Sequence, residues 1–522
     1  MSNLRILLKN SFLKFVNVFR GKDKKKSVKS GAVTLCVCVL GVLALYTFQA
    51  YSMIADLSQY GFSILCLFNG LLITTSVVLI LGVSRTAGNK KSKDEDLLLS
   101  MPIKKRDIVL SKTLSKYIFD FCFVFVLFMP YFVLYEIFEG FKFIQLLCAL
   151  LVCVIMPLLS VGLTFLCDFV IAKLFNKSKY ANFLKTMMAV LILVLVMLLM
   201  FLKTFAYGNA INVDIDSFIS DRIITSSCLH FILNQNIEKM FIILGITILP
   251  FVLGLMAYSK TLGSNEVKYQ SKIGGLKFHE PKREFSGLLK KEFNYYLTNP
   301  TYATNTIIAP VMSIALAIIV AIEGLSKICA GFGVAIPSDM FVGVVVLIEC
   351  FMFSTACISA SGISLEGKAF WIIKSMPINI NKFFIAKILL NLTICGVPIV
   401  ISSIIYLFAL KLTLVKFLLV LFIPLIFVLL LSVLGLFINL CLPKLKWEDD
   451  VQVFKQSLSV IVTMLLGMVI SLIQVGAYFM FRYSIDLTLI CLIVLAIYMF
   501  LTIAILFLTF TSGKTKFNKL HD

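Results

Sequence analysis

Twelve apolar segments, each long enough to cross a membrane as a helix, dominate this sequence of 522 residues. A helix needs about 20 predominantly apolar residues to span a hydrocarbon core about 30 Å thick. Charged residues make up only 14% of the chain, against about 25% in soluble domains. The bilayer must therefore act as its solvent, and we predict an all-α polytopic membrane protein. The predicted spans lie near 32–56, 61–83, 113–136, 143–172, 186–206, 238–258, 304–322, 340–362, 384–408, 414–440, 456–480 and 485–510.

Lysine and arginine are distributed unequally between alternate loops. The loops on the side of the N-terminus hold 40 of these residues and the opposite loops hold 8. The positive-inside rule then predicts an even number of spans with both termini in the cytoplasm. Because topology and contacts with lipid headgroups explain the net charge of +21, we expect no nucleic-acid partner. No secretory signal precedes the first span, so we expect that span to stay in the membrane.

The sequence repeats itself. Ser-Met-Pro-Ile occurs at 100–103 and again at 375–378, and a lysine follows each proline by ten residues, at Lys112 and Lys387. Six spans in each half predict a parallel repeat, with halves at 1–258 and 285–522 joined by a linker at 259–284. Further matches, at offsets between 267 and 281, are Pro130 with Pro398, Pro157 with Pro424, Lys177 and Lys179 with Lys444 and Lys446, and Leu4, Leu7, Leu8, Phe12 and Phe15 with Phe285, Leu288, Leu289, Phe293 and Tyr296.

A segment with helical apolar periodicity precedes each half, at 3–20 and at 285–299. Its apolar residues fall on one face, and most of its lysines lie off that face. This pattern favours an elbow helix in the cytoplasmic interface, with the apolar face toward lipid. The alternative is a soluble helix packed on a partner.

The loop after the second span of each half, at 84–112 and 363–387, combines acids, a short apolar run and a proline. Since proline disfavours helix at the preceding residue, a short helix should stop near Ser100 or Ser375, and a new helix can start at the proline. Such a helix can dock in a groove of a partner protein. Alternatively, its apolar residues dip into the membrane–water interface, and the residues alone do not decide between the two. The residues assigned to this coupling element are Asp94, Glu95, Asp96, Leu97, Leu98, Leu99, Pro102, Glu366, Trp371, Ile372, Ile373 and Pro377.

Residues suited to chemistry are few. The cysteines and the three histidines show no metal-ligand spacing, so we expect no metal or cofactor on this chain and no catalytic residue. Glu349 lies mid-span, where an acid is a candidate for a translocation path or a protonated structural residue. The one long external loop, 207–237, contains three aspartates, and we expect it to be solvated.

The coupling loops resemble those of ABC transporter permeases of the second export class, in the bacterial form with two fused halves. The resemblance rests on the acidic-then-leucine run that ends in Ser-Met-Pro-Ile and is followed by a lysine. The other segments that share it are Leu288–Phe293 with Asn299-Pro300, Ser364–Lys368 with Trp371–Ser375, Pro443–Glu448, and Lys455–Ser457.

This resemblance implies a permease of the bacterial cytoplasmic membrane that binds two copies of a separate ATPase subunit, which would carry ATP and Mg²⁺. In agreement, the chain has no phosphate-binding loop: before Gly513-Lys514-Thr515, Leu508 stands in place of the first glycine. The alternatives are a carrier of the major facilitator type and a lipid-linked glycosyltransferase. The first usually has an aspartate in the loop that here reads Gly82–Lys90, and the second needs clustered external acids.

Overall fold

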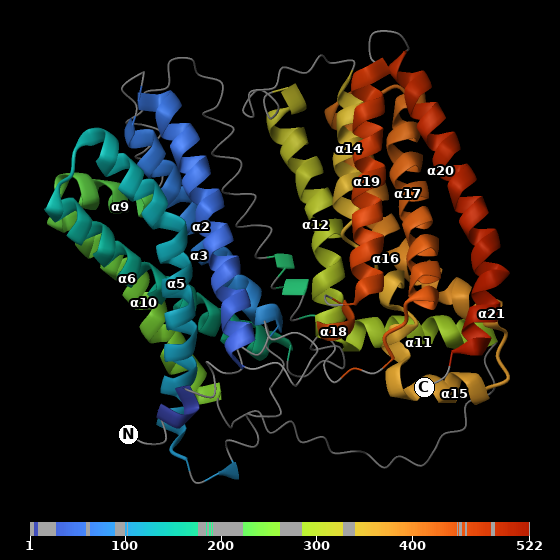
Figure 1. Cartoon of the computed structure of the whole chain (residues 1–522), viewed down its shortest axis with the longest axis horizontal. Coiled ribbons are helices and arrows are strands. Elements are labelled where there is room, and N and C mark those ends of the chain that lie inside the picture. Colours follow the sequence, from blue (N-terminus) through green and yellow to red (C-terminus); the bar gives the residue numbers. More distant parts are fainter. Residues whose placement is uncertain are drawn as a thin grey trace. The chain divides into compact units, whose positions relative to one another are not determined.

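A computed structural model describes most of the chain as helices joined by turns (Figure 1). The described residues are 5–8, 28–58, 63–88, 100–101, 103–175, 184, 187–188, 190–191, 223–261, 284–326, 340–445, 447, 451–454, 457–481 and 486–520. Contacts divide the chain into two compact units, one formed by 1–177 with 211–270 and the other by 178–210 with 271–522. The predicted boundaries of the two halves stay predictions.

The first unit is a bundle of long apolar helices. In Figure 1, α3, α5 and α6 run side by side, and the short α9 lies at one end of the bundle. The helices of this unit are α2 (Val28–Ser58), α3 (Ser63–Gly88), α5 (Lys105–Glu139), α6 (Phe143–Phe175), α9 (Ile223–Asn234) and α10 (Ile237–Thr261).

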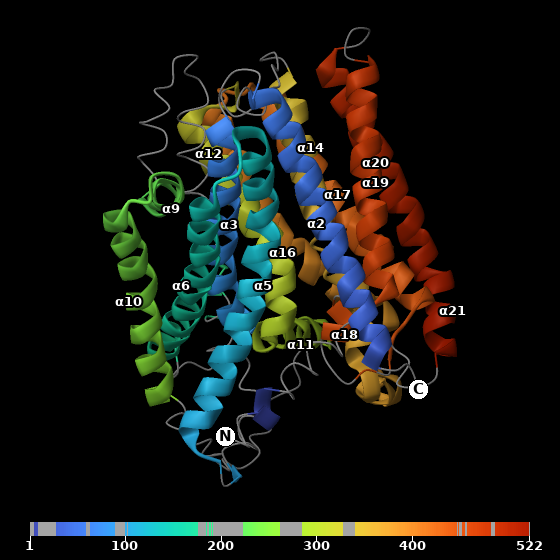
Figure 2. The ribbon, with the colours of Figure 1, turned by 60° about the vertical axis from the view of Figure 1, so that its left-hand side comes forward.

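The second unit combines long spanning helices with short elements at one end. In both views α11 lies across the lower end of α12 and α16, and α15 lies farther from the spans than α11 (Figures 1 and 2). The helices of this unit are α11 (Glu284–Thr298), α12 (Pro300–Glu323), α14 (Phe341–Phe353), η2 (Ser359–Ser361), η3 (Ser364–Ala369), α15 (Phe370–Ser375), α16 (Ile380–Ala409), α17 (Leu414–Cys441), α18 (Val451–Phe454), α19 (Leu458–Phe481), α20 (Leu487–Phe510) and α21 (Ser512–Lys519).

Nine helices within the described residues are long and apolar enough to cross a membrane. Two more predicted spans correspond to α2 and to α14, which are helical but have shorter apolar stretches. The predicted span 186–206 lies mostly outside the described residues, although Val190 packs against Ile307 and Ala315 in the second unit. The predicted class is confirmed: the chain is an all-α polytopic membrane protein.

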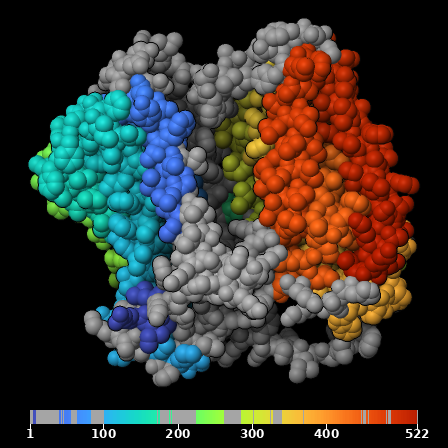
Figure 3. All heavy atoms as spheres, viewed as in Figure 1, coloured from blue at the N-terminus to red at the C-terminus, as the bar shows by residue number. Residues whose placement is uncertain are grey.

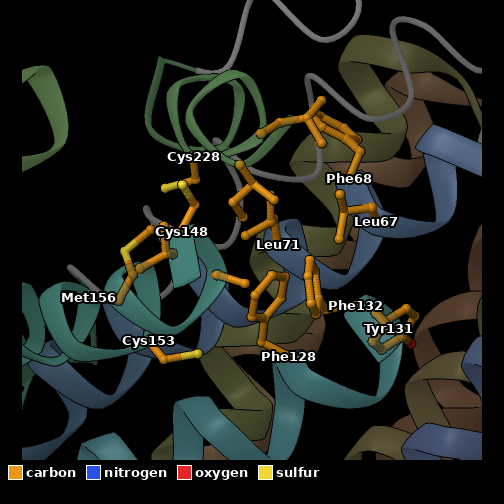
Figure 4. Close-up of a cluster of buried hydrophobic side chains, with 14 of the residues drawn as sticks. Leu67, Phe68, Leu71, Phe128, Tyr131, Phe132, Cys148, Cys153, Met156 and Cys228 are labelled. Carbon is orange, nitrogen blue, oxygen red and sulfur yellow. The ribbon is translucent and has the colours of Figure 1, made fainter. Parts of the chain in front are cut away.

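A cluster of buried apolar side chains lies inside the first unit (Figure 4). Phe128 and Phe132 of α5 pack with Leu71 of α3, and Cys153 of α6 and Cys228 of α9 complete the cluster. All of these side chains are labelled in Figure 4, and all are buried. The thiols of Cys153 and Cys228 are buried there as small, nearly apolar groups.

Part of the predicted external loop is not a solvated segment. Ile223–Asn234 forms the helix α9, and Thr225, Leu229 and Ile232 are buried in the first unit. The helix is apolar enough to bury one face. The three aspartates earlier in the loop led to the prediction that the whole loop is solvated. Those aspartates lie outside the described residues.

The predicted span 340–362 is not one continuous helix. The helix α14 ends at Phe353 after 13 residues, and residues 354–369 continue as turns and the short 3₁₀ helices η2 and η3. Small and polar residues replace the apolar run at this point, so the backbone there is bonded by side chains of neighbouring helices. Such backbone is tolerated at membrane depth only where protein surrounds it.

The outer surface of the second unit is apolar along α20, whose atoms are red in Figure 3. Ile493, Ile497, Phe500 and Phe507 of this helix are all exposed, at spacings of three, four and seven residues that place them on one face. A stripe of this kind is expected where a helix faces lipid rather than water.

Candidate functional site

The helix α15 is packed on the second unit through one face. Phe370 and Ile373 are buried in a cluster with Phe383, Phe384 and Phe517. The rings of Phe370 and Phe517 meet edge to face, with centroids 5.2 Å apart, a favoured geometry for aromatic pairs. The predicted stop is confirmed, because α15 ends at Ser375 before Pro377.

The opposite face of α15 exposes large apolar side chains. Trp371 is 59% exposed, Ile372 37% and Met376 50%, and Pro377 is exposed as well. Of the apolar residues that the sequence assigned to the coupling element of the second half, Trp371 and Ile372 are therefore available to a partner. Ile373 is not, because it belongs to the packed face.

The coupling element of the first half lies largely outside the described residues. Asp94, Glu95, Asp96, Leu97, Leu98, Leu99 and Pro102 are all among the residues that the structure does not describe. The helix α5 begins at Lys105, three residues after the proline at 102, and not at the proline, where the sequence predicted a new helix.

Glu366 is held in an ion cluster inside the unit instead of facing outward. Lys387 donates to Glu366 Oε1 at 2.9 Å and to Glu292 Oε1 at 3.0 Å. Lys291 donates to both oxygens of Glu366, at 2.7 and 2.8 Å. The cluster joins α11, η3 and α16, and its two lysines balance its two glutamates. The side chain of Glu366 is therefore bonded within the unit, and its contact with a partner stays a prediction.

The charges around Glu366 also set its protonation. Burial by itself would raise the pKa of Glu366, but Lys387 and Lys291 lower it below the usual value for a glutamate. Glu366 is thus ionised at neutral pH and stays ionised to a lower pH than an ordinary glutamate. A buried ion pair of this kind becomes costly when one partner is removed, because the other charge stays buried.

A second contact ties the start of α11 to the start of α16. Glu284 Oε1 accepts from the backbone N–H of Asn379 at 2.7 Å, and Glu284 Oε2 accepts from Lys382 at 2.6 Å. The hydrogen bond from Lys382 is the main cause that lowers the pKa of the exposed Glu284. The segment between α15 and α16 is therefore fixed to α11 at two places.

Lys387 gives the matched proline-to-lysine spacing a different meaning from the one the sequence suggested. A docking helix was expected to need that spacing, yet in the second half it places Lys387 beside Glu292 and Glu366. In the first half Lys112 lies 6.0 Å above the ring of Tyr258. In the second half the spacing thus serves an internal ion cluster, and its role in docking stays a prediction.

The irregular segment between α14 and α15 is bonded by side chains from three other helices, α12, α17 and α19. Asn439 Oδ1 of α17 accepts from the backbone N–H groups of Ile363 at 2.8 Å and Ser364 at 3.0 Å. Ser459 Oγ donates to Ala360 O at 2.9 Å, and Tyr302 Oη donates to Ile358 O at 3.2 Å. These bonds replace the helical ones that the backbone lost.

Gly367 and the tryptophan beside it complete this segment. Gly367 has φ +50°, and a Cβ there would lie 2.8 Å from Trp447 Nε1, so both the backbone and the space favour glycine. Trp447 Nε1 in turn donates to Ser364 O at 2.8 Å. The segment that leads into α15 is thus rigidly held.

Glu349 lies in α14 and is fully buried. Ser313 Oγ donates to its Oε1 at 3.0 Å. Ser402 is a second hydroxyl beside it, but Ser402 donates to Ile399 O at 3.1 Å. Glu349 Oε2 has no hydrogen-bond partner within the described part of the chain. The geometry is that of an uncharged carboxyl group in a mostly apolar interior.

The sequence missed Glu292, Lys387, Asn439 and Trp447 as parts of one assembly. A signal existed for two of them, because Lys387 and Asn439 interrupt apolar spans, where polar residues have special roles. Nothing in the sequence shows that residues so far apart meet.

The comparisons support the membrane fold. A family model described as a membrane protein of 12 TMs matches residues 28–511. No curated protein matches the chain, and no solved structure does. Among the residues with described side chains, no three His, Cys, Asp or Glu gather in a group that could hold a metal ion.

Proposed function

The chain belongs to this family of twelve-span membrane proteins, and from that premise we propose that it is the permease subunit of an ATP-driven ABC exporter. The permease forms the translocation pathway across the bacterial cytoplasmic membrane, with both termini in the cytoplasm. Its short cytoplasmic helices bind two separate ATPase subunits, which carry ATP and Mg²⁺. The chain itself catalyses no reaction and binds no nucleic acid, and its other partners are membrane lipids.

One observation carries this proposal: α15 exposes Trp371, Ile372 and Met376 on the side opposite its packed face. Because α15 lies farther from the spans than α11 (Figure 1), an interfacial α11 leaves α15 beyond the headgroups. A short helix in water with three exposed apolar side chains favours a partner's groove.

The mounting of α15 supports a coupling role. Glu366 and Lys387 lie on either side of α15 in the chain and are bonded to each other. Glu284 holds Asn379, which caps α16. A shift of α15 imposed by a partner would therefore move α11 and α16 together. Transport then follows as a shift between inward-facing and outward-facing populations, driven by the ATPase.

Binding of a separate ATPase subunit tests the proposal. We expect an ATPase subunit to co-purify with the tagged chain from its native membrane and to be identified by mass spectrometry. Trp371→Asp and Leu98→Asp should each weaken its binding at least about tenfold, since an apolar anchor contributes about 1.5–3 kcal/mol and each 1.4 kcal/mol is a decade. Trp371→Phe is the matched control and should bind nearly as well as wild type. Equal binding by wild type and both aspartate variants would show that the assignment is wrong.

The two tryptophans of the chain permit a direct measurement at the docking helix. Trp447→Phe leaves Trp371 as the single tryptophan. We expect acrylamide to quench its fluorescence strongly in the isolated protein and much less after the ATPase subunit binds. Unchanged quenching at saturation would place the ATPase elsewhere on the chain.

A carrier of the major facilitator type is the second candidate, and Glu349 is the observation that favours it. A buried mid-span carboxyl could take up and release a proton during transport. That function predicts transport without ATP and its loss in Glu349→Gln, while the protein stays folded. Transport that requires ATP and survives this substitution would exclude it.

A further inference from the structure

Two polar atoms in the interior of the second unit have no hydrogen-bond partner within the described part of the chain. They are Glu349 Oε2 in α14 and Tyr406 Oη in α16, and both side chains are fully buried. Buried polar atoms are nearly always bonded to protein or to ordered water, because an unbonded one is destabilising. The two atoms therefore indicate a binding site for a further group.

The two atoms belong to one group of polar side chains between α12, α14 and α16. Ser402 lies beside Glu349, and Tyr406 follows Ser402 by four residues, which places both on the same face of α16. Tyr406 is also close enough to Glu349 for the two side chains to interact electrostatically. From α12, Ser313 donates to Glu349 Oε1 at 3.0 Å. Glu349 Oε2 and Tyr406 Oη are therefore neighbours that do not bond to each other.

Burial and charge restrict what can bind at this place, which we call the Glu349 site and define by Ser313, Glu349, Ser402 and Tyr406. All four side chains are fully buried, so the site is closed to large solutes. None of the ion pairs among the described residues includes Glu349. Because an ionised carboxylate without a counter-charge is costly in such a place, Glu349 is neutral. Its Oε1 accepts from Ser313, so Oε2 carries the proton.

The hydrogen bonds that these groups can still make fit one water molecule. The hydroxyl groups at Glu349 Oε2 and Tyr406 Oη are donors without acceptors. Ser402 Oγ can accept, because its own proton is donated to Ile399 O at 3.1 Å. A water molecule can accept from two donors and donate to a third group, and buried waters make about three hydrogen bonds. A metal ion such as Mg²⁺ needs about six oxygen ligands, which is more than these side chains supply.

We propose that one water molecule is bound in the Glu349 site, where it accepts from Glu349 Oε2 and Tyr406 Oη and donates to Ser402 Oγ. The water and the bond from Ser313 together connect α12, α14 and α16 inside an otherwise apolar bundle. Glu349 is then held as a neutral carboxyl group whose two oxygens are both bonded. This inference is independent of the proposed function, since it needs no ATPase subunit.

The sign of the change in stability in Tyr406→Phe tests for the water. Removal of a hydroxyl that is bonded to water should raise the unfolding equilibrium constant in mixed micelles about fivefold. Removal of a hydroxyl without any partner would leave that constant unchanged or lower it. Glu349→Gln should unfold like wild type, because an amide can accept from Ser313 and donate to the water as the neutral carboxyl group does.

A double-mutant cycle tests whether Glu349 and Tyr406 share the water. In a Glu349→Leu background the water has already lost a partner, so Tyr406→Phe should have little further effect. Tyr296→Phe is the matched control, because Tyr296 Oη bonds directly to Thr306 Oγ1 at 3.0 Å in the same unit. It should raise the unfolding constant equally in the wild-type and Glu349→Leu backgrounds.

Several results would overturn the site. A Tyr406→Phe variant as stable as wild type or more stable would show that the hydroxyl has no partner. Additive effects of Glu349→Leu and Tyr406→Phe would show that the two residues share no water. If Glu349→Gln unfolds far more readily than wild type, the carboxyl group is ionised and the occupant is a cation. Should Glu349→Leu fail to fold, Tyr406→Phe and Glu349→Gln still decide the question.

A density map of the protein in nanodiscs gives a direct check. In a map that shows ordered water elsewhere in the chain, we expect a peak within hydrogen-bond distance of both Glu349 Oε2 and Tyr406 Oη. The peak should be absent from the map of Tyr406→Phe combined with Glu349→Leu. A direct bond from Tyr406 to another protein group in the wild-type map would contradict the proposal.

Discussion

The helices α3 and α14 occupy corresponding places in the two repeats, yet only one of them is continuous. The helix α3 runs for 26 residues from Ser63 to Gly88, whereas α14 stops at Phe353 after 13. Past that point α14 gives way to a segment rich in serine and glycine, and α3 continues through an apolar run. Two segments related by the repeat therefore differ in structure, because polar side chains that can bond irregular backbone are present in the second half.

The partners of the irregular segment have no equivalents in the first half. At the repeat offset of 267, Asn439 corresponds to Ala172, and at the offset of 275, Glu366 corresponds to Lys91. Of the charged residues in the ion cluster, only Lys387 has a charged counterpart of the same kind in the first half, which is Lys112. The second half thus combines an interrupted helix with a polar network and a charge-balanced cluster. Figure 4 shows an apolar cluster in the first unit, where Asp120 and Glu136 are also buried.

The matched lysines give the largest predicted difference between the halves. Lys387→Met leaves Glu292 and Glu366 buried without their shared cation, and breaking a buried pair in this way costs about 3–5 kcal/mol. Lys112, which lies 6.0 Å above the ring of Tyr258, is half-exposed, so we expect a smaller loss from Lys112→Met, because water can replace the contacts of a partly exposed charge. The free energy of unfolding in mixed micelles measures both. Equal losses would mean that the halves do not differ at this lysine.

Asn439 gives the next largest effect. Asn439→Leu leaves the N–H groups of Ile363 and Ser364 buried without an acceptor, and each orphaned group costs about 1–3 kcal/mol. We expect a loss of at least about 2 kcal/mol in unfolding free energy, with faster hydrogen exchange confined to 354–369. The control is Ser432→Ala, which removes a hydroxyl bonded to Asn391 but leaves those two N–H groups satisfied. Unchanged exchange in the segment would contradict the role of Asn439.

Acidification should weaken the second unit by a smaller amount. The folded pKa of Glu366 lies below its ordinary value because of Lys387 and Lys291. The stabilisation from this group is therefore complete above an unfolded pKa of about 4.3 and is lost as the pH falls through the lower folded pKa. Each unit of that lowering contributes about 1.4 kcal/mol. Thermal unfolding between neutral pH and that range measures it, and Glu366→Gln should remove this part of the pH dependence.

The exposed face of α15 should contribute least to stability. Trp371→Ala should change the unfolding free energy by less than about 0.5 kcal/mol, as expected for a surface substitution, although it should weaken binding of the ATPase subunit. Its neighbour Phe370 is buried, and Phe370→Ala should cost about 3 kcal/mol or more. A large loss of stability in Trp371→Ala would show that this side chain packs within the chain and is no docking residue.

Particular residues show how far the sequence reaches. The stop of α15 at Ser375 and the helix across Pro300–Glu323 followed from local rules on proline and hydropathy. The helix α14 did not, because its end is set by bonds from Asn439 and Ser459, about 80 to 100 residues away in the chain. The ion pairs of Glu366 were not foreseen for the same reason, because the sequence does not show whether water or a buried lysine faces an acid at a helix start.

The sequence by itself determined that this chain is a membrane protein, that its membrane-spanning segments are helices, and that it contains an internal sequence repeat. Hydropathy decides these features because the cost of burying an unbonded backbone group in lipid applies to each segment separately. Only the tertiary structure decided which polar residues meet, as in the contact of Lys387 with both Glu292 and Glu366. A hydrogen bond or ion pair depends on distances of about 3 Å between residues far apart in the chain, and packing alone fixes those distances.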